Sequence, residues 1–221
     1  MKKLTLLFGA LALSTAVFAQ KGLELGLNIA PQNTWIFNQQ DFDEGDNLNF
    51  RATIGYNVGA NVGYNFTNSI GIRSGIGFSA QGQNYINDNT NIPSAIKLNY
   101  LKVPVLLKFN SDPQSATAFL ATVGVDMGFL AGGKATVDGE EVPSEFFDVK
   151  EVYNSFDLAA VVGLGLQARI TDQINLNFML RVSYSLLDIE NADFKPVGRE
   201  SANHMIGGFQ IGANYVLFGE E

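Results

Sequence analysis

Three neighbouring residues near the C-terminus carry the side chains of an acyl-transfer site. Ser201 could supply a nucleophilic hydroxyl, His204 a general base and Glu200 a group that orients the base. Such chemistry needs each of these groups within hydrogen-bond reach of the next. All three residues fall where a polar loop is expected to meet a strand, and their spacing does not fix that geometry. We therefore interpret His204 as a loop residue and predict no catalytic residues.

Metal ligation is the second kind of chemistry that the residue types allow. The chain has no cysteine and only one histidine, so neither a thiolate site nor a histidine-rich site is available. Four carboxylates lie close together in the first long polar segment: Asp41, Asp43, Glu44 and Asp46. They could hold calcium, but the spacing of an EF-hand loop is missing. We interpret the segment as a solvated acidic loop, to which Trp35, Phe37 and Phe42 add aromatic surface, and predict no metal.

One glycine-rich segment matches the dinucleotide-binding fingerprint by letter: Gly163-Leu164-Gly165-Leu166-Gln167-Ala168. That fingerprint works only where it follows a strand and opens a helix. Here it lies inside an alternating apolar pattern that predicts a strand. We interpret its glycines as small residues on the inner face of a sheet, and predict no cofactor.

The elements that position these residues have a period of two. Residues 51–66 alternate Ile, Tyr, Val, Ala and Phe on one face with Gly, Asn and Thr on the other, which predicts a long two-faced strand. Similar patterns predict seven more strands, at residues 22–30, 70–81, 96–109, 116–130, 154–170, 173–187 and 205–218. Pro104 lies inside the fourth strand, where it removes one ladder bond, and we expect a bulge or an irregular register there.

The connections alternate in length. Segments 31–49, 83–95, 131–153 and 188–203 are long, polar and acidic, whereas 67–69, 110–115 and 171–172 are tight turns. Outer-membrane barrels have this asymmetry, with short periplasmic turns and long external loops. The pattern predicts an all-β fold: one eight-stranded antiparallel transmembrane β-barrel of up-and-down topology, with both termini in the periplasm. Phe146 and Phe147 in the third long loop could contact a partner.

The composition of the two faces favours lipid outside the barrel. The polar face is built largely of Gly, Ser and Asn, which suits the narrow interior of eight strands better than a solvated exterior. The apolar face would then meet acyl chains, and closure would satisfy every backbone group. A soluble sandwich or lipocalin-like barrel is the alternative.

Charged residues also lie on the polar face: Glu24, Arg51, Arg73, Asp126, Asp157, Arg169 and Arg181. Buried charges must pair, so we expect a salt-bridge network that fills the lumen. A polar path for a small solute is the alternative, although eight strands leave no open channel.

The N-terminus has the three parts of a secretory signal. Lys2 and Lys3 precede an apolar run, and Val17 and Ala19 are its small-x-small end. We predict a signal peptide over residues 1–19, cleaved after Ala19, and a barrel domain over residues 20–221. Cleavage would change the net charge from −8 to −10, and so acidic a chain without a basic stripe is not expected to bind nucleic acid.

The segment Tyr100-Leu101-Lys102-Val103-Pro104-Val105-Leu106-Leu107-Lys108-Phe109 resembles a strand of the PorT-like family of small outer-membrane β-barrel proteins. The lead-in Gly75-Ile76-Gly77-Phe78 and the following Gly124-Val125-Asp126 fit as well. The resemblance implies the barrel fold and an outer-membrane location, and one member of the family is implicated in protein secretion. It supplies no catalytic residues.

We therefore expect an integral outer-membrane protein that is not an enzyme and has a structural, surface-interaction or secretion-associated role. Its expected partners are outer-membrane lipid and lipopolysaccharide, together with other envelope or secretion proteins. A narrow pore or small-solute transporter is the alternative, and a lipid-modifying barrel enzyme is a more distant one.

Overall fold

The computed structural model describes residues 22–38, 48–87, 89–112, 115–195 and 198–217. Its elements are β1 (Leu23–Asn38), β2 (Leu48–Arg51), β3 (Thr53–Asn65), β4 (Ile70–Asn87), β5 (Pro93–Asn110), β6 (Thr117–Val137), β7 (Glu140–Glu141), α3 (Val149–Val152), β8 (Phe156–Arg169), β9 (Ile174–Ser185) and β10 (Ala202–Val216). In these ranges no helix is long and apolar enough to cross a membrane. The predicted signal peptide, residues 1–19, lies outside the described residues.

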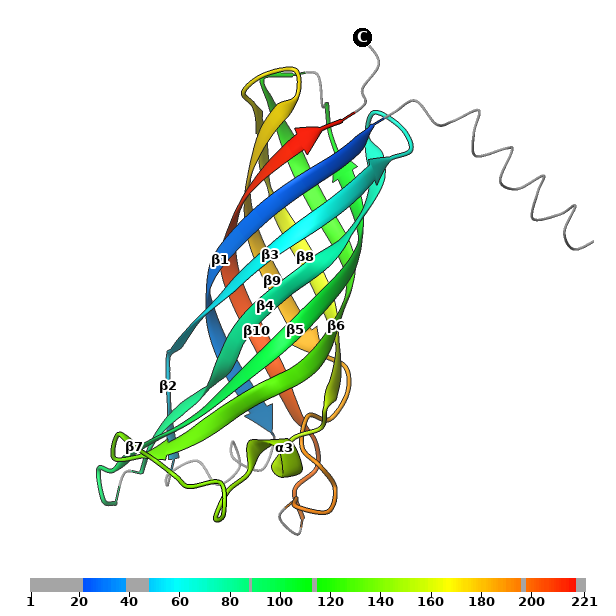
Figure 1. Ribbon diagram of the computed structural model, residues 1–221. Helices are drawn as coiled ribbons and strands as arrows, with labels where there is room; N and C mark the ends of the chain where they lie inside the picture. Colours follow the sequence, from blue (N-terminus) through cyan, green and yellow to red (C-terminus); the bar gives the residue numbers. More distant parts are fainter. Residues whose placement is uncertain (1–21, 39–47, 88, 113–114, 196–197, 218–221) are drawn as a thin grey trace, which may run out of the picture.

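Eight long strands close into an antiparallel barrel (Figure 1). Each pairs with the next long strand along the chain, and β10 returns to pair with β1, so that Glu24 faces Val216. The short strands β2 and β7 only extend the edges of β4 and β6. The predicted eight-stranded up-and-down barrel is therefore confirmed, and closure leaves no free sheet edge among its long strands.

The two ends of the barrel differ. One end, which we call the turn end, carries the three tight turns, the start of β1 and the end of β10. The opposite end, the loop end, carries β7, α3 and the longer connections (Figure 1). The described ends of the chain thus lie together, as an even number of strands requires.

Several strands run further toward the loop end than the sequence predicts. β1 continues to Asn38 instead of ending at residue 30, and the hairpin of β4 and β5 leaves only five residues between its strands. Segments 31–38 and most of 83–95 are therefore strand, and their prediction as loop is wrong. Ladder pairing continues where apolar and polar residues no longer alternate, so the period of two ends before the strand does.

Apolar side chains cover the outside of the barrel and polar side chains fill it. Leu27 and Leu180 point outward and are 68% and 67% exposed, whereas Asn57, Asn177 and Ser183 are buried inside. This arrangement is the reverse of a soluble barrel. It confirms the assignment of the two faces from the alternating pattern.

Pro104 does not shift the register. The β4–β5 ladder lacks the pairs opposite Val103 and Pro104, but the strands keep one register on both sides of the gap. The register of β5 with β6 shifts instead at Asn99 and Tyr100, where Ala131 is the additional residue. The expected irregular register at Pro104 is wrong, because a missing N–H removes a bond without adding a residue.

Replacing Gly165 with Ala is expected to destabilise the barrel by about 1–3 kcal/mol, the usual cost of overpacking. A Cβ on Gly165 would lie 2.0 Å from the carbonyl oxygen of Phe178 and 2.7 Å from the Cα of Met179, both in the backbone of β9. Urea unfolding of refolded protein in detergent measures the change. Gly207→Ala is the control, because its Cβ would meet only the ring of Trp35 at 4.0 Å. Equal unfolding of the two variants would contradict the prediction.

Candidate functional site

The three residues considered for acyl transfer do not form a triad. His204 lies in β10 rather than in a loop, and its buried ring packs edge-on to Tyr100 with 5.5 Å between ring centroids. Neither nitrogen of that ring has a hydrogen-bond partner among the described residues. Ser201 donates to Asn203 instead, at 3.1 Å, and Glu200 accepts a hydrogen bond from Lys195 through its backbone carbonyl. The prediction of His204 as a loop residue is wrong, because β10 begins three residues earlier than expected.

The proposed calcium ligands Asp41, Asp43, Glu44 and Asp46 lie outside the described residues. Trp35 and Phe37 belong to β1 rather than to the first loop. Among the residues that the structure describes, no three His, Cys, Asp or Glu side chains come together as a metal site. The absence of a cofactor and of catalytic residues stays a prediction.

Charged side chains do pair inside the lumen, as expected. Near the turn end, the carboxylate of Glu24 accepts from Arg73 Nη2 at 2.8 Å and from Lys108 Nζ at 2.8 Å. All three residues are buried. Gly63 leaves the room for this cluster, since a Cβ there would lie 2.5 Å from Glu24 Oε1.

Two further ion pairs lie nearer to the loop end. Asp126 pairs with Arg181, and Asp157 accepts from Lys102 Nζ at 3.3 Å and from the Ser185 hydroxyl at 3.0 Å. A Cβ on the facing Gly128 would approach Lys102 Nζ to 2.9 Å. The lumen is thus crossed at three levels by charge-assisted contacts.

The predicted and observed members of this network differ. Arg51 is exposed, and Arg169 pairs with Asp172 at a turn, at 2.6 Å, so neither joins the lumen. Sequence analysis missed Lys102 and Lys108, because the apolar residues of their strand do not keep one alternating phase. The usable signal was that both lysines alternate with outward-facing Leu101 and Leu107.

A polar cavity lies among these charges. It is lined by Arg73, Lys102, Asp126 and Arg181, by asparagines of β1 and β3, and by apolar side chains such as Ile76 and Leu106. Asn28 donates to Asn57 at 3.3 Å and accepts from Asn61 at 3.3 Å. The lumen therefore combines fixed charges with amide groups that can bind water or a small ion.

A hydrophobic cluster lies at the loop end, beyond the charged part of the lumen. We call this cluster, with segments 142–155, 186–195 and 198–201, the loop-end cap. The buried members of the cluster are Ile36, Leu98, Tyr100, Val149, Tyr153, Ile189 and Ala202. α3 places Val149 in this cluster, and the side chain of Asp148 begins the helix by accepting from the Lys150 amide at 2.8 Å. Burial raises the pKa of Tyr153 well above its usual value, so this phenol stays neutral.

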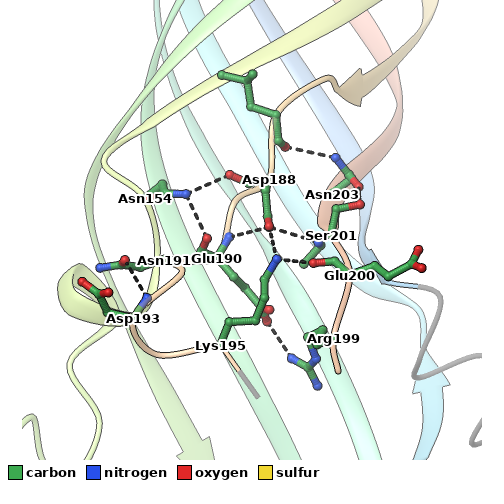
Figure 2. A network of polar contacts seen from close by, with 12 residues as sticks. Asn154, Asp188, Glu190, Asn191, Asp193, Lys195, Arg199, Glu200, Ser201 and Asn203 are labelled. Carbon is green, nitrogen blue, oxygen red and sulfur yellow. Dashed lines mark hydrogen bonds and ion pairs between the residues drawn. The ribbon is translucent and has the colours of Figure 1, made fainter. Parts of the chain in front are cut away.

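Polar contacts hold the second segment of the loop-end cap in place (Figure 2). Asp188 accepts from the amides of Glu190 and Ala202, both at 3.1 Å, and pairs with Lys195. Asn154 ties this segment to the first one by donating to the carbonyls of Asp188 and Glu190, each at 2.9 Å. Two loops far apart in the sequence thus form one ordered surface.

The two acidic side chains of this network respond oppositely to their surroundings. Burial alone would raise the pKa of Asp188, but the hydrogen bonds from Lys195 and the two amides lower it below its usual value. Burial raises the pKa of Glu190, although Arg199 donates to it at 2.7 Å. Asp188 is therefore the carboxylate that stabilises the cap in its charged form.

Asp188→Asn is expected to speed hydrogen exchange at the Ala202 amide by about tenfold, which corresponds to about 1.4 kcal/mol. The estimate lies at the low end for charged hydrogen bonds, because the carboxylate is partly exposed. The pKa of Asp188 in the folded protein lies below its usual value of 3.8. Protection of the Ala202 amide is therefore complete above pH 3.8 and is lost as the pH falls through the lowered pKa of Asp188. Unchanged exchange in this variant would contradict the account. Asp193→Asn is the control. Asp193 lies in the same loop, and its contact with Asn191 is made by its backbone amide rather than by its carboxylate.

Prediction and structure differ on the two aromatic residues of the third long loop. Phe146 is 81% exposed, in keeping with a contact surface, whereas Phe147 packs against the hydrophobic cluster. Phe194, in the second segment of the loop-end cap, is exposed as well. Sequence could not separate the two neighbours, because only the folded loop decides which of them turns inward.

A family model described as "Outer membrane protein beta-barrel domain" matches residues 18–191, well over half of the chain. No curated protein matches the chain.

Three solved structures are similar to the chain. Neisserial surface protein A is 12% identical, with a TM-score of 0.47, over 87% of this chain and 96% of that one. The outer membrane protein OprG from Pseudomonas aeruginosa is 10% identical, with a TM-score of 0.48, over 90% and 98%. The attachment invasion locus protein of Yersinia pestis, solved with the heparin analogue sucrose octasulfate, is 13% identical, with a TM-score of 0.43, over 89% and 99%.

Proposed function

Since this chain belongs to the outer membrane protein beta-barrel domain family, we propose that it is a non-enzymatic outer-membrane protein that engages partners at the cell surface through its loop-end cap. The observation that carries this proposal is the ordered cap itself. Its buried cluster and its Asp188 network stabilise two loops that a purely structural barrel could leave short. A fixed surface binds with a smaller loss of conformational entropy than a mobile one.

The chemistry of the cap indicates the kind of partner. Segments 142–155 and 186–201 carry seven carboxylates, Glu145, Asp148, Glu151, Asp188, Glu190, Asp193 and Glu200, against three basic residues, Lys150, Lys195 and Arg199. Exposed Phe146 and Phe194 add aromatic surface, which is common at interface hot spots. A protein with basic and apolar surface fits this combination. The apolar, outward face of the barrel strands would contact outer-membrane lipid and lipopolysaccharide.

The resemblance of residues 100–109 to the PorT-like family narrows the proposal toward secretion. That segment forms the second half of β5, where it provides Lys102 and Lys108 to the lumen and Tyr100 to the base of the cap. A secretion-associated barrel would dock other envelope proteins on its loops.

Export through a signal peptide cleaved after Ala19 belongs to the same proposal. The N-terminal sequence of the mature protein should then begin at Gln20.

Photo-crosslinking in intact cells tests the proposed function. A photoreactive residue replacing Phe146 should give a discrete adduct with another envelope protein, whereas the same residue replacing Leu180 on the lipid face should not. Adding Asp188→Asn should reduce the adduct, because the cap is then less ordered. Absence of a specific adduct from Phe146 would contradict a surface-interaction role.

A narrow pore is the second candidate, and the polar cavity in the lumen is the observation that favours it. The hydrophobic cluster packed at the loop end opposes it. Single-channel recording in planar bilayers separates the two candidates. A closed barrel should give no steady openings, and a reproducible unit conductance would favour the pore.

A further inference from the structure

Among the residues that the structure describes, the lumen holds one more positive than negative charge. Its cations are Arg73, Lys102, Lys108 and Arg181, and its carboxylates are Glu24, Asp126 and Asp157. Asp126 and Asp157 each balance one cation. The excess charge therefore lies at Glu24, whose single carboxylate is shared by Arg73 and Lys108. This imbalance is notable in a chain whose net charge is −8.

Arg73 lines the cavity, and its guanidinium is not fully paired. Its side chain is 95% buried, its Nη2 donates to Glu24, and its Nε has no hydrogen-bond partner among the described residues. The Nε of Arg181, on the same cavity, has none either. Buried guanidinium N–H groups are costly to leave unpaired.

The surroundings of the cavity supply further donors. Lys102 lines it, and the side-chain amides of Asn28 and Asn61 each use one of their two hydrogens in the bonds to Asn57 and Asn28. Asp126 lines the cavity as well, but Arg181 balances its charge. The lining thus carries three cations against one carboxylate, and its unpartnered atoms include the acceptors Asp126 Oδ1 and Asn61 Oδ1 as well as these donors.

We propose that this cavity binds one small monovalent anion of the size of chloride, in contact with the guanidinium of Arg73. A single negative charge cancels the excess at the Glu24 cluster, in a cavity that is lined by three cations. The low dielectric of the interior strengthens this attraction relative to water. The anion would fill part of the lumen and stabilise the folded barrel, because only the folded state offers the site.

Anomalous diffraction from crystals of the full mature protein grown in sodium bromide tests the proposal. We expect a bromide peak beside Arg73 within the lumen. An adventitious ion only, with bromide confined to the surface, would overturn it. So would an empty lumen.

A second measurement does not need crystals. The thermal unfolding midpoint should rise and saturate as bromide replaces gluconate at constant ionic strength. Arg73→Gln should abolish the rise, whereas Arg169→Gln, which removes only the exposed pair with Asp172, should keep it. If Arg73→Gln does not fold, the wild-type titration still decides: a midpoint that is independent of bromide contradicts the site.

Discussion

Glu24→Gln is expected to lower the free energy of unfolding by about 3–5 kcal/mol, the usual cost of removing one partner from a buried ion pair. The change leaves Arg73 and Lys108 buried in the lumen without their shared carboxylate. Glutamine is nearly the same size as glutamate, so the loss measures charge rather than packing. Urea unfolding of protein refolded into lipid vesicles gives the value.

Asp172→Asn is the matched control for this experiment. It removes the carboxylate that pairs with Arg169, but that carboxylate is 92% exposed at a turn. Surface pairs of this kind contribute about 0–1 kcal/mol. If Glu24→Gln is no more destabilising than Asp172→Asn, the lumen cluster does not stabilise the barrel as argued here.

Leu180→Arg is expected to destabilise the inserted barrel by about 2–4 kcal/mol, the cost of arginine on the lipid face near the bilayer midplane. Leu180 lies near the middle of β9 and is 67% exposed, between Leu164 of β8 and Phe209 of β10. In water, an arginine at so exposed a position would cost little. The experiment therefore measures the apolar surroundings of this face, again by unfolding from vesicles.

Ile54→Arg makes the same chemical change at the loop end. Ile54 is the second residue of β3 and is 86% exposed, beyond the central belt of the barrel. Near the interface the cost of arginine falls to about 0–1 kcal/mol. Equal, small effects of the two substitutions would show that the outward face is not in lipid.

Sequence patterns predicted the barrel because its physics is local and periodic. The alternation at residues 51–66 follows directly from one lipid-facing and one lumen-facing side of β3, and tight turns at one end give the topology. The ends of the strands could not be read in this way. Around Asn38 and Asn87 the ladder continues without an apolar face, so no period of two marks it.

The candidate site was harder to predict, because its contacts join distant parts of the chain. Glu24 and Lys108 are 84 residues apart, and Asn154 reaches across to a loop that begins more than 30 residues later. The residues of the loop-end cap have ordinary loop composition, and only folding shows that Tyr153 and Ile189 are buried together. His204 seemed chemically notable in the sequence, yet in the fold it packs against Tyr100 at the base of this cap.

The central claim is that the apolar outer face of a closed barrel lies in the outer membrane. Electrophoresis of the membrane-extracted protein in cold SDS, with and without boiling, tests it most directly when combined with fractionation of the envelope. We expect the protein in the outer-membrane fraction and a shift in mobility on boiling, because closed barrels resist SDS until they are heated. A soluble periplasmic protein without such a shift would contradict the claim.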